Sequence, residues 1–236
     1  MMQAALEFPL SARDLVTKTI LSLPEILRPT SVSLAEDEAA TAIGDVDVFL
    51  QAFKMPTSGV YLQNSTVLYD LRRSSPSTWI VDADLDAIPE ATVRDFLIHM
   101  AIARPIFGFA CAKDELEHRN RISTQLGINT IYSKVGRDTQ KYVPGLYWWT
   151  LLPASLAEQH GVPLSTLEGA AQEHIELGGQ QHLLRFYEKP EDWQSAPVMA
   201  KLYCSLPGVF NVEKVRPKLQ GATTFLELNA ILDAWS

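Results

Sequence analysis

Three carboxylates stand at alternating positions after a short β-branched run, at Asp82, Asp84 and Asp86. Alternate residues of a strand share one face, so an extended backbone would gather them into a possible ligand set for a divalent cation. The segment lacks the glycine and the distal glutamate of a helix–loop–helix calcium loop. The alternative is that these acids precede a helix beginning near Pro89 and interact with its dipole. We favour this second interpretation and predict no metal ligands here.

The densest charged stretch is Lys113–Arg121, which contains Glu115, Glu117 and His118. An acid and a histidine close together can transfer protons. The sequence places no nucleophile and no glycine-rich loop beside them, so we favour a solvated face or a partner-binding edge. A small metal- or acid/base-dependent enzyme that uses Glu115, Glu117 or His118 is the alternative.

The other histidines and the two cysteines do not show the spacing of a metal site. His160, His174 and His182 lack zinc-ligand spacing, and neither Cys111 nor Cys204 has a second cysteine nearby. Both cysteines lie in apolar runs, which predicts buried free thiols. The chain also lacks the Gly-x-Ser-x-Gly, P-loop and dinucleotide-binding fingerprints. We therefore predict no cofactor and no catalytic residues.

Composition indicates a globular protein with a substantial core. The chain has 236 residues, of which 47% are hydrophobic and 20% charged, which fits one large domain or two small ones. The first residues do not show a basic segment followed by an apolar one, and no apolar run approaches the ~20 residues that span a bilayer. We therefore expect no signal peptide, no membrane contact and a cytoplasmic location.

The negative charge is confined to the first half of the chain. Residues 1–118 hold 17 Asp and Glu against 9 Lys and Arg, which accounts for the whole net charge of −8, whereas residues 119–236 hold 11 of each. Nucleic-acid binders need a basic footprint, so this distribution argues against that class. It favours a basic protein partner attracted by opposite charge, and simple solubility is the alternative.

Three segments carry the clearest structural signals. The aromatic run Leu146–Leu152 predicts a buried central strand, followed by a short helix over Ser155–His160. Residues 89–105 predict a helix with proline at each end and an apolar stripe at helical spacing. Gly178-Gly179 lies between two short runs and predicts the turn of a hairpin.

The remaining pattern predicts short strands near residues 31–34, 60–62, 66–71, 78–81 and 106–111, and helices over 197–206 and 225–235. The expected fold is α+β, or α/β, with a mixed and largely antiparallel sheet, helices packed on one side, and possibly two similar halves. We expect an N-terminal helical segment over residues 1–29, an acidic α/β half over 30–136 and a second α/β half over 137–236. These would form one compact unit.

Two segments together resemble a known family. Phe107-Gly-Phe-Ala-Cys-Ala-Lys-Asp-Glu-Leu-Glu-His-Arg-Asn-Arg121 ends the first half, and Gly145-Leu-Tyr-Trp-Trp-Thr-Leu-Leu-Pro153 opens the second, before a short helix closed by His160-Gly161. This order resembles the immunity proteins of bacterial polymorphic toxins and type VI secretion effectors, of the immunity-protein-fifty-two type, formerly a domain of unknown function. The similarity covers roughly residues 30–215. Thr150 and the Leu-Leu-Pro after it depart from the family's pattern.

The resemblance implies a cytoplasmic protein without catalytic activity that binds a cognate toxin or effector and neutralises it by occlusion. A structural or assembly protein is a further alternative. Complementary charge pairs at such interfaces can contribute several kcal/mol. Charge density alone, rather than a family motif, selects our candidate contacts with a basic partner, which are Glu36, Asp37, Glu38, Asp82, Asp84, Asp86, Asp114, Glu115 and Glu117.

Overall fold

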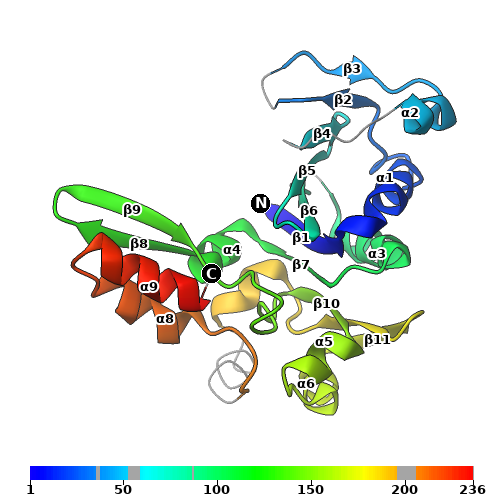
Figure 1. Cartoon of the computed structure of the whole chain (residues 1–236). Coiled ribbons are helices and arrows are strands. Elements are labelled where there is room, and N and C mark those ends of the chain that lie inside the picture. The colour runs from blue at the N-terminus through cyan, green and yellow to red at the C-terminus, as the bar shows by residue number, and fades with distance from the viewer. Residues whose placement is uncertain (36–37, 53–58, 87, 196–205, 236) are drawn as a thin grey trace.

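The computed structural model describes residues 1–35, 38–52, 59–86, 88–195 and 206–235 (Figure 1). Most strands belong to one ten-stranded antiparallel sheet, which confirms the predicted α+β class. In spatial order the strands of this sheet are β11 (Glu173–Leu177), β12 (Gln181–Arg185), β10 (Trp149–Pro153), β7 (Phe107–Ala112), β1 (Met2–Pro9), β6 (Thr78–Asp84), β5 (Leu68–Arg73), β4 (Val60–Gln63), β2 (Ser31–Ser33) and β3 (Thr41–Ala42).

The first strand, β1, lies in the middle of the sheet between β6 and β7. Its residues Ala4, Ala5, Leu6 and Phe8 are almost fully buried. A strand covered on both faces does not alternate between apolar and polar residues, so β1 lacks the usual sequence signal of a strand. The prediction that residues 1–29 form a helical segment is therefore wrong for β1, and α1 (Arg13–Leu21) follows it.

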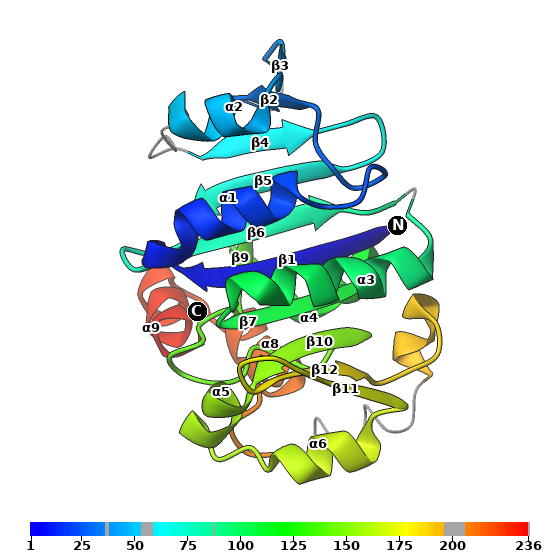
Figure 2. The same cartoon turned by 90° about the vertical axis from the view of Figure 1, so that its right-hand side faces the viewer.

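Two helices pack together on one face of the sheet. Figure 2 shows α1 and α3 (Glu90–Met100) in front of β1, β6 and β7, with α2 (Val46–Ala52) beside α1. The predicted apolar stripe of α3 is confirmed, because Val93, Phe96, Leu97 and Met100 are all fully buried. Burial of each such side chain stabilises the fold by about 1.5–3 kcal/mol, so the stripe fixes α3 on the sheet.

A second structural unit projects from the opposite face of the sheet. The chain leaves β7 through α4 (Lys113–Asn120) and enters the hairpin of β8 (Arg121–Leu126) and β9 (Asn129–Lys134). The helices α8 (Val212–Gln220) and α9 (Phe225–Trp235) pack on one face of this hairpin (Figure 1). Ile122 and Leu126 meet Val215 and Leu219 in a core separate from the main one. We call the hairpin with α8 and α9 the arm.

The two predicted halves are joined by both the sheet and the arm. β10, from the second half, pairs with β7 of the first, and the arm combines β8 and β9 with two C-terminal helices. Both hydrophobic cores therefore draw residues from either side of the proposed boundary at residues 136 and 137. The boundary follows a change in composition rather than a gap between packed units.

The helix α5 and the hairpin that follow β10 agree with the sequence prediction. α5 (Ala154–Gln159) and α6 (Leu164–Ala170) precede the hairpin of β11 and β12, whose turn residues Gly179 and Gln180 have φ values of 76° and 62°. The helix predicted over 197–206 lies almost wholly outside the described residues, as does Cys204, whereas Cys111 is a buried free thiol as predicted. Within the described part of the chain, the helices are too short or too polar to cross a membrane.

Candidate functional site

A polar cleft of about 390 Å³ lies between the sheet and the arm. Strands β1, β4, β5 and β6 form one wall, on the sheet face opposite α1 and α3, while α4 and the arm form the other (Figure 1). Side chains of both charges line it. The charged lining residues are Asp70, Arg72, Asp82, Asp84, Lys113, Glu117, Arg121, Lys134 and Arg137.

The sheet wall is predominantly acidic because of the register between β5 and β6. Asp70 lies directly opposite Asp82, and like charges in this position repel each other. Arg72 relieves the repulsion, because its guanidinium donates a hydrogen bond to each of the two carboxylates. Arg137 reaches Asp82 from the other wall, with 3.6 Å between Nη1 and Oδ1. Burial by itself lowers the pKa of Arg72. The nearby carboxylates of Asp82 and Asp70 outweigh burial and raise this pKa above its ordinary value.

The opposite wall carries mostly cations. Glu117 and Arg121 form an exposed ion pair at 2.8 Å across one turn at the end of α4. Lys113 and Lys134 also line the cleft, and Asp84 faces them from β6. Among the described residues no ion pair engages Asp84, Lys113 or Lys134. Asp84 Oδ1 accepts a hydrogen bond of 3.2 Å from the Asp86 backbone N–H, but no opposite charge in the described part of the chain neutralises any of the three groups, so each can attract a charge on an incoming molecule.

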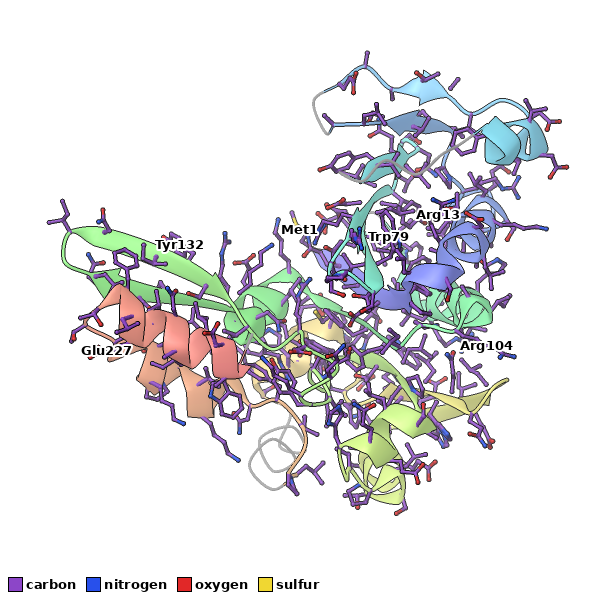
Figure 3. The ribbon with its side chains drawn as sticks, in the orientation of Figure 1. Met1, Arg13, Trp79, Arg104, Tyr132 and Glu227 are labelled. Carbon is purple, nitrogen blue, oxygen red and sulfur yellow. The ribbon has the colours of Figure 1, made fainter. Side chains whose placement is uncertain are left out.

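The exposed face of the hairpin adjoins the basic wall at Arg121 and Lys134 and carries neutral polar side chains beyond them. Ile122, Thr124 and Leu126 of β8 are buried against the helices of the arm, so the residues between them point away from that core. Tyr132 pairs with Ser123 on this outward face and is 64% exposed, and Figure 3 shows it on the side of the hairpin away from α9. Only the base of the hairpin, at Arg121 and Lys134, belongs to the cleft among the described residues.

Two of the three alternating aspartates meet in this cleft. Asp82 and Asp84 point to the same side of β6, as an extended backbone requires. Asp86 lies beyond the end of the strand, where it accepts a hydrogen bond of 2.8 Å from the Met2 backbone N–H and lies 3.6 Å from the Met1 amino group. Asp82 and Asp84 of the predicted contacts thus lie in the cleft, whereas Asp86 lies outside it.

The other predicted contacts are scattered over the surface. Glu38 is exposed near the outer strands, and Glu36 and Asp37 lie outside the described residues. Asp114 accepts a hydrogen bond of 3.1 Å from the indole of Trp193. Of the predicted contacts that lie within the described residues, Asp82, Asp84 and Glu117 line the cleft.

Glu115 is completely buried, so its predicted role as a surface contact is wrong. Its carboxylate lies 2.8 Å from the Arg119 guanidinium and accepts a hydrogen bond from the Tyr187 hydroxyl. Arg119 also donates to the Leu146 backbone oxygen at 2.7 Å and lies over the Tyr147 ring. The buried face of α4 therefore carries charged residues. A search for apolar residues at helical spacing cannot detect such a face.

Burial raises the pKa of Glu115 to about 7, and the Arg119 cation and the Tyr187 hydroxyl act in the opposite direction. A carboxyl group with such a pKa can serve as a general acid or base, but it must also reach a substrate. Glu117 pairs with Arg121, and His118 lies 3.2 Å from Glu213 of the arm. Glu115, Glu117 and His118 therefore do not converge on one site.

A different cluster escaped the sequence analysis. Glu168 of α6 meets His174 of β11 and His182 of β12, and one ligand-type atom of each lies within 4.8 Å of the others. It is the only such group of three among the described residues. The sequence spacing of these residues shows no ligand pattern because a helix and two paired strands bring them together. The register of the predicted hairpin is the signal that could have placed the two histidines on one face.

The comparisons with known proteins add no relative. No family model, no curated protein and no solved structure matches this chain.

Proposed function

We propose that this protein is an inhibitor of the immunity type, which binds a cognate bacterial toxin or effector in the cytoplasm and occludes its active site. The cleft between the sheet and the arm is the binding surface, and its two oppositely charged walls are the observation that carries the proposal. A projecting arm beside an open sheet face suits a convex protein surface. The class is suggested by the resemblance seen in the sequence at residues 107–121 and 145–153.

The free charges of the cleft define what the partner must present. Asp84 attracts a basic side chain, whereas Lys113 and Lys134 attract acidic ones. Asp82 and Glu117 already form ion pairs with Arg72 and Arg121, so each attracts a basic partner less strongly than an unpaired carboxylate would. The acidic first half of the chain favours a basic partner at long range, and the cleft fixes its orientation at contact.

The test begins with co-purification of the untagged protein with the product of the adjacent upstream gene. Affinity is then measured over a series of salt concentrations. We expect a one-to-one complex that weakens as salt rises, because exposed charge pairs are screened. Failure to bind this product, with both proteins folded, would contradict the immunity proposal.

Charge reversals locate the interface. Asp84→Lys and Lys134→Glu each place a like charge opposite the partner's group and should weaken the complex at least tenfold. Glu25→Lys and Lys18→Glu make the same charge changes at exposed positions on the opposite side of the sheet and should leave affinity unchanged. If neither the two cleft variants nor the two controls weaken the complex, the proposed function stands but the cleft is not the binding surface.

A further inference from the structure

We propose that Glu168, His174 and His182 form a binding site for a divalent transition-metal ion, of which Zn²⁺ is the best fit. The site lies at the far edge of the sheet, away from the cleft, and it does not depend on the proposed inhibitor function. α6 supplies the carboxylate, and the paired strands β11 and β12 supply one imidazole each.

The backbone places the two histidines for joint coordination. In the antiparallel register His174 pairs with Leu184 and His182 pairs with Glu176. The two histidines are thus diagonal neighbours on one face of the hairpin, within reach of each other's side chains. Glu176 stands on this same face, where its charge favours a bound cation. α6 brings Glu168 to the histidines from outside the hairpin.

The distances between the three ligand atoms match a tetrahedral metal site. His174 Nε2 and His182 Nδ1 are 3.0 Å apart, and Glu168 Oε1 lies 3.6 Å from each. The point equidistant from all three in their plane lies about 2.0 Å from each atom. Zinc–nitrogen and zinc–carboxylate bonds are about 2.0–2.2 Å long, so the ion would sit slightly above this plane. A fourth position remains for water or another ligand.

The imidazole rings have the separation expected for a shared ion. Their centroids lie 5.3 Å apart. Two imidazoles bound to one zinc at a tetrahedral angle have centroids about 5 Å apart, given metal–nitrogen bonds of about 2.0 Å. This agreement is independent of the carboxylate.

Hydrogen bonding alone does not account for the carboxylate. The contact of 3.0 Å between the histidines is compatible with one ring donating to the other. Glu168 Oε1, at 3.6 Å from both rings, is too far away for a hydrogen bond to either. The separation fits an ion pair with a charged imidazole, and it is also normal for two ligands of one ion. A metal would satisfy all three atoms at once.

The ligand types and exposure indicate which ion would bind and what it would do. Two imidazoles with one carboxylate suit Zn²⁺ and its neighbours in the first transition series, rather than Ca²⁺ or Mg²⁺. His182 is 7% exposed while Glu168 and His174 are partly open to solvent, so an ion can enter from the surface. The bound ion would join α6 to the outermost strands of the sheet and would keep one exchangeable position.

The test is a titration of the untagged, chelator-stripped full chain with Zn²⁺ against a chromophoric chelator. A parallel titration with Co²⁺ reports geometry, because a tetrahedral Co²⁺ site gives intense visible absorption bands. We expect one ion per chain. Glu168→Gln, His174→Ala and His182→Ala should each weaken Zn²⁺ binding at least tenfold and remove the Co²⁺ bands.

Matched controls separate this site from adventitious binding. Glu158→Gln on the neighbouring α5 and His118→Ala on α4 change the same residue types at exposed positions and should bind Zn²⁺ as the wild type does. Glu168→Gln and His174→Ala alter partly exposed side chains, so they test the site even if His182→Ala fails to fold. The proposal would be overturned if Glu168→Gln and His174→Ala bound Zn²⁺ as tightly as the wild type. It would also be overturned if both variants gave the same Co²⁺ absorption bands as the wild type.

Discussion

The substitution Glu115→Gln tests whether the buried end of α4 is a scaffold whose stability depends on pH. Glutamine has the same shape and can still accept the hydrogen bond from Tyr187, but it cannot ionise. Any change in pH dependence therefore comes from the loss of one titrating group. We expect the free energy of unfolding of the variant to lie within about 1 kcal/mol of the wild-type value near pH 5 and clearly above it near pH 8.

The sign follows from proton binding in the two states. Burial raises the pKa of Glu115 from 4.5 to about 7, so the folded chain retains this proton over a pH range in which the unfolded chain has lost it. The free energy of unfolding of the wild type consequently falls as pH rises from 4.5 to 7. The pKa difference corresponds to about 3 kcal/mol. The variant lacks this decrease, so its advantage at pH 8 should approach that value.

The assay is urea unfolding at intervals of pH from 5 to 8, followed by tryptophan fluorescence. Glu117→Gln is the control. Glu117 is two residues from Glu115, and its substitution removes the same kind of charge from an exposed ion pair with Arg121. Exposed pairs contribute about 0–1 kcal/mol, so this control should shift the curve little and should not change its pH dependence relative to the wild type.

Two results would refute the reasoning. Identical pH dependence of wild type and Glu115→Gln would mean that Glu115 has the same pKa in the folded and unfolded chains. A variant less stable than the wild type by 3–5 kcal/mol at pH 8 would mean that Arg119 holds Glu115 ionised, and that the ion pair outweighs the cost of burial.

Three further substitutions test the fold around the cleft. Leu219→Ala removes a fully buried side chain from the arm core and should lower the free energy of unfolding by about 2–5 kcal/mol in urea titrations. Gly208→Ala should lower the melting temperature, because φ is +82° and the new Cβ would lie 2.1 Å from a backbone oxygen at the end of α5. Arg72→Met removes the cation between Asp70 and Asp82, so the two carboxylates repel each other. It should lower the free energy of unfolding by about 1 kcal/mol in low salt and by less in high salt, as measured by urea unfolding at both ionic strengths.

Sequence patterns predicted the elements whose buried faces are apolar. The stripe of α3 and the strand β10 both present side chains that periodicity or continuous hydrophobicity detects. The turn at Gly179 also follows directly from residue type, since a positive φ favours glycine. These elements depend on local chemistry, which a single sequence records.

The elements that escaped prediction lack that apolar signal. β1 contains two adjacent buried alanines, and alanine is not enriched in strands. α4 buries Glu115, Arg119 and Asn120, so its inward face looks like a solvated one in the sequence. A helix that buries charges is recognisable only when the partners that neutralise them are known. Here Glu115 and Arg119 neutralise each other within α4, and the groups that complete their hydrogen bonding, Tyr187 and the Leu146 carbonyl, come from distant parts of the chain.

The candidate sites were harder to predict than the fold because both depend on packing between distant segments. The alternation of Asp82 and Asp84 was visible, but their neutralising neighbours Arg72 and Arg137 come from β5 and from the far side of the cleft. Charge density consequently overestimated how many acidic groups are free. For the cluster of Glu168 with two histidines, the carboxylate comes from a separate helix, so spacing along the chain could not reveal it.

The buried network of α4 also determines where the arm stands. Asn120 donates to the Val135 oxygen at the end of the hairpin and accepts a hydrogen bond from Tyr147, which stacks on Phe109 of β7. On the same helix, Glu115 contacts Tyr187 and Arg119 contacts the Leu146 carbonyl, which joins α4 to the second half of the chain. Polar contacts are directional, so they fix the angle of a helix more narrowly than apolar packing does. The cleft lies directly beside α4 and Asn120 lines it, so this network ties the cleft to both the sheet and the hairpin.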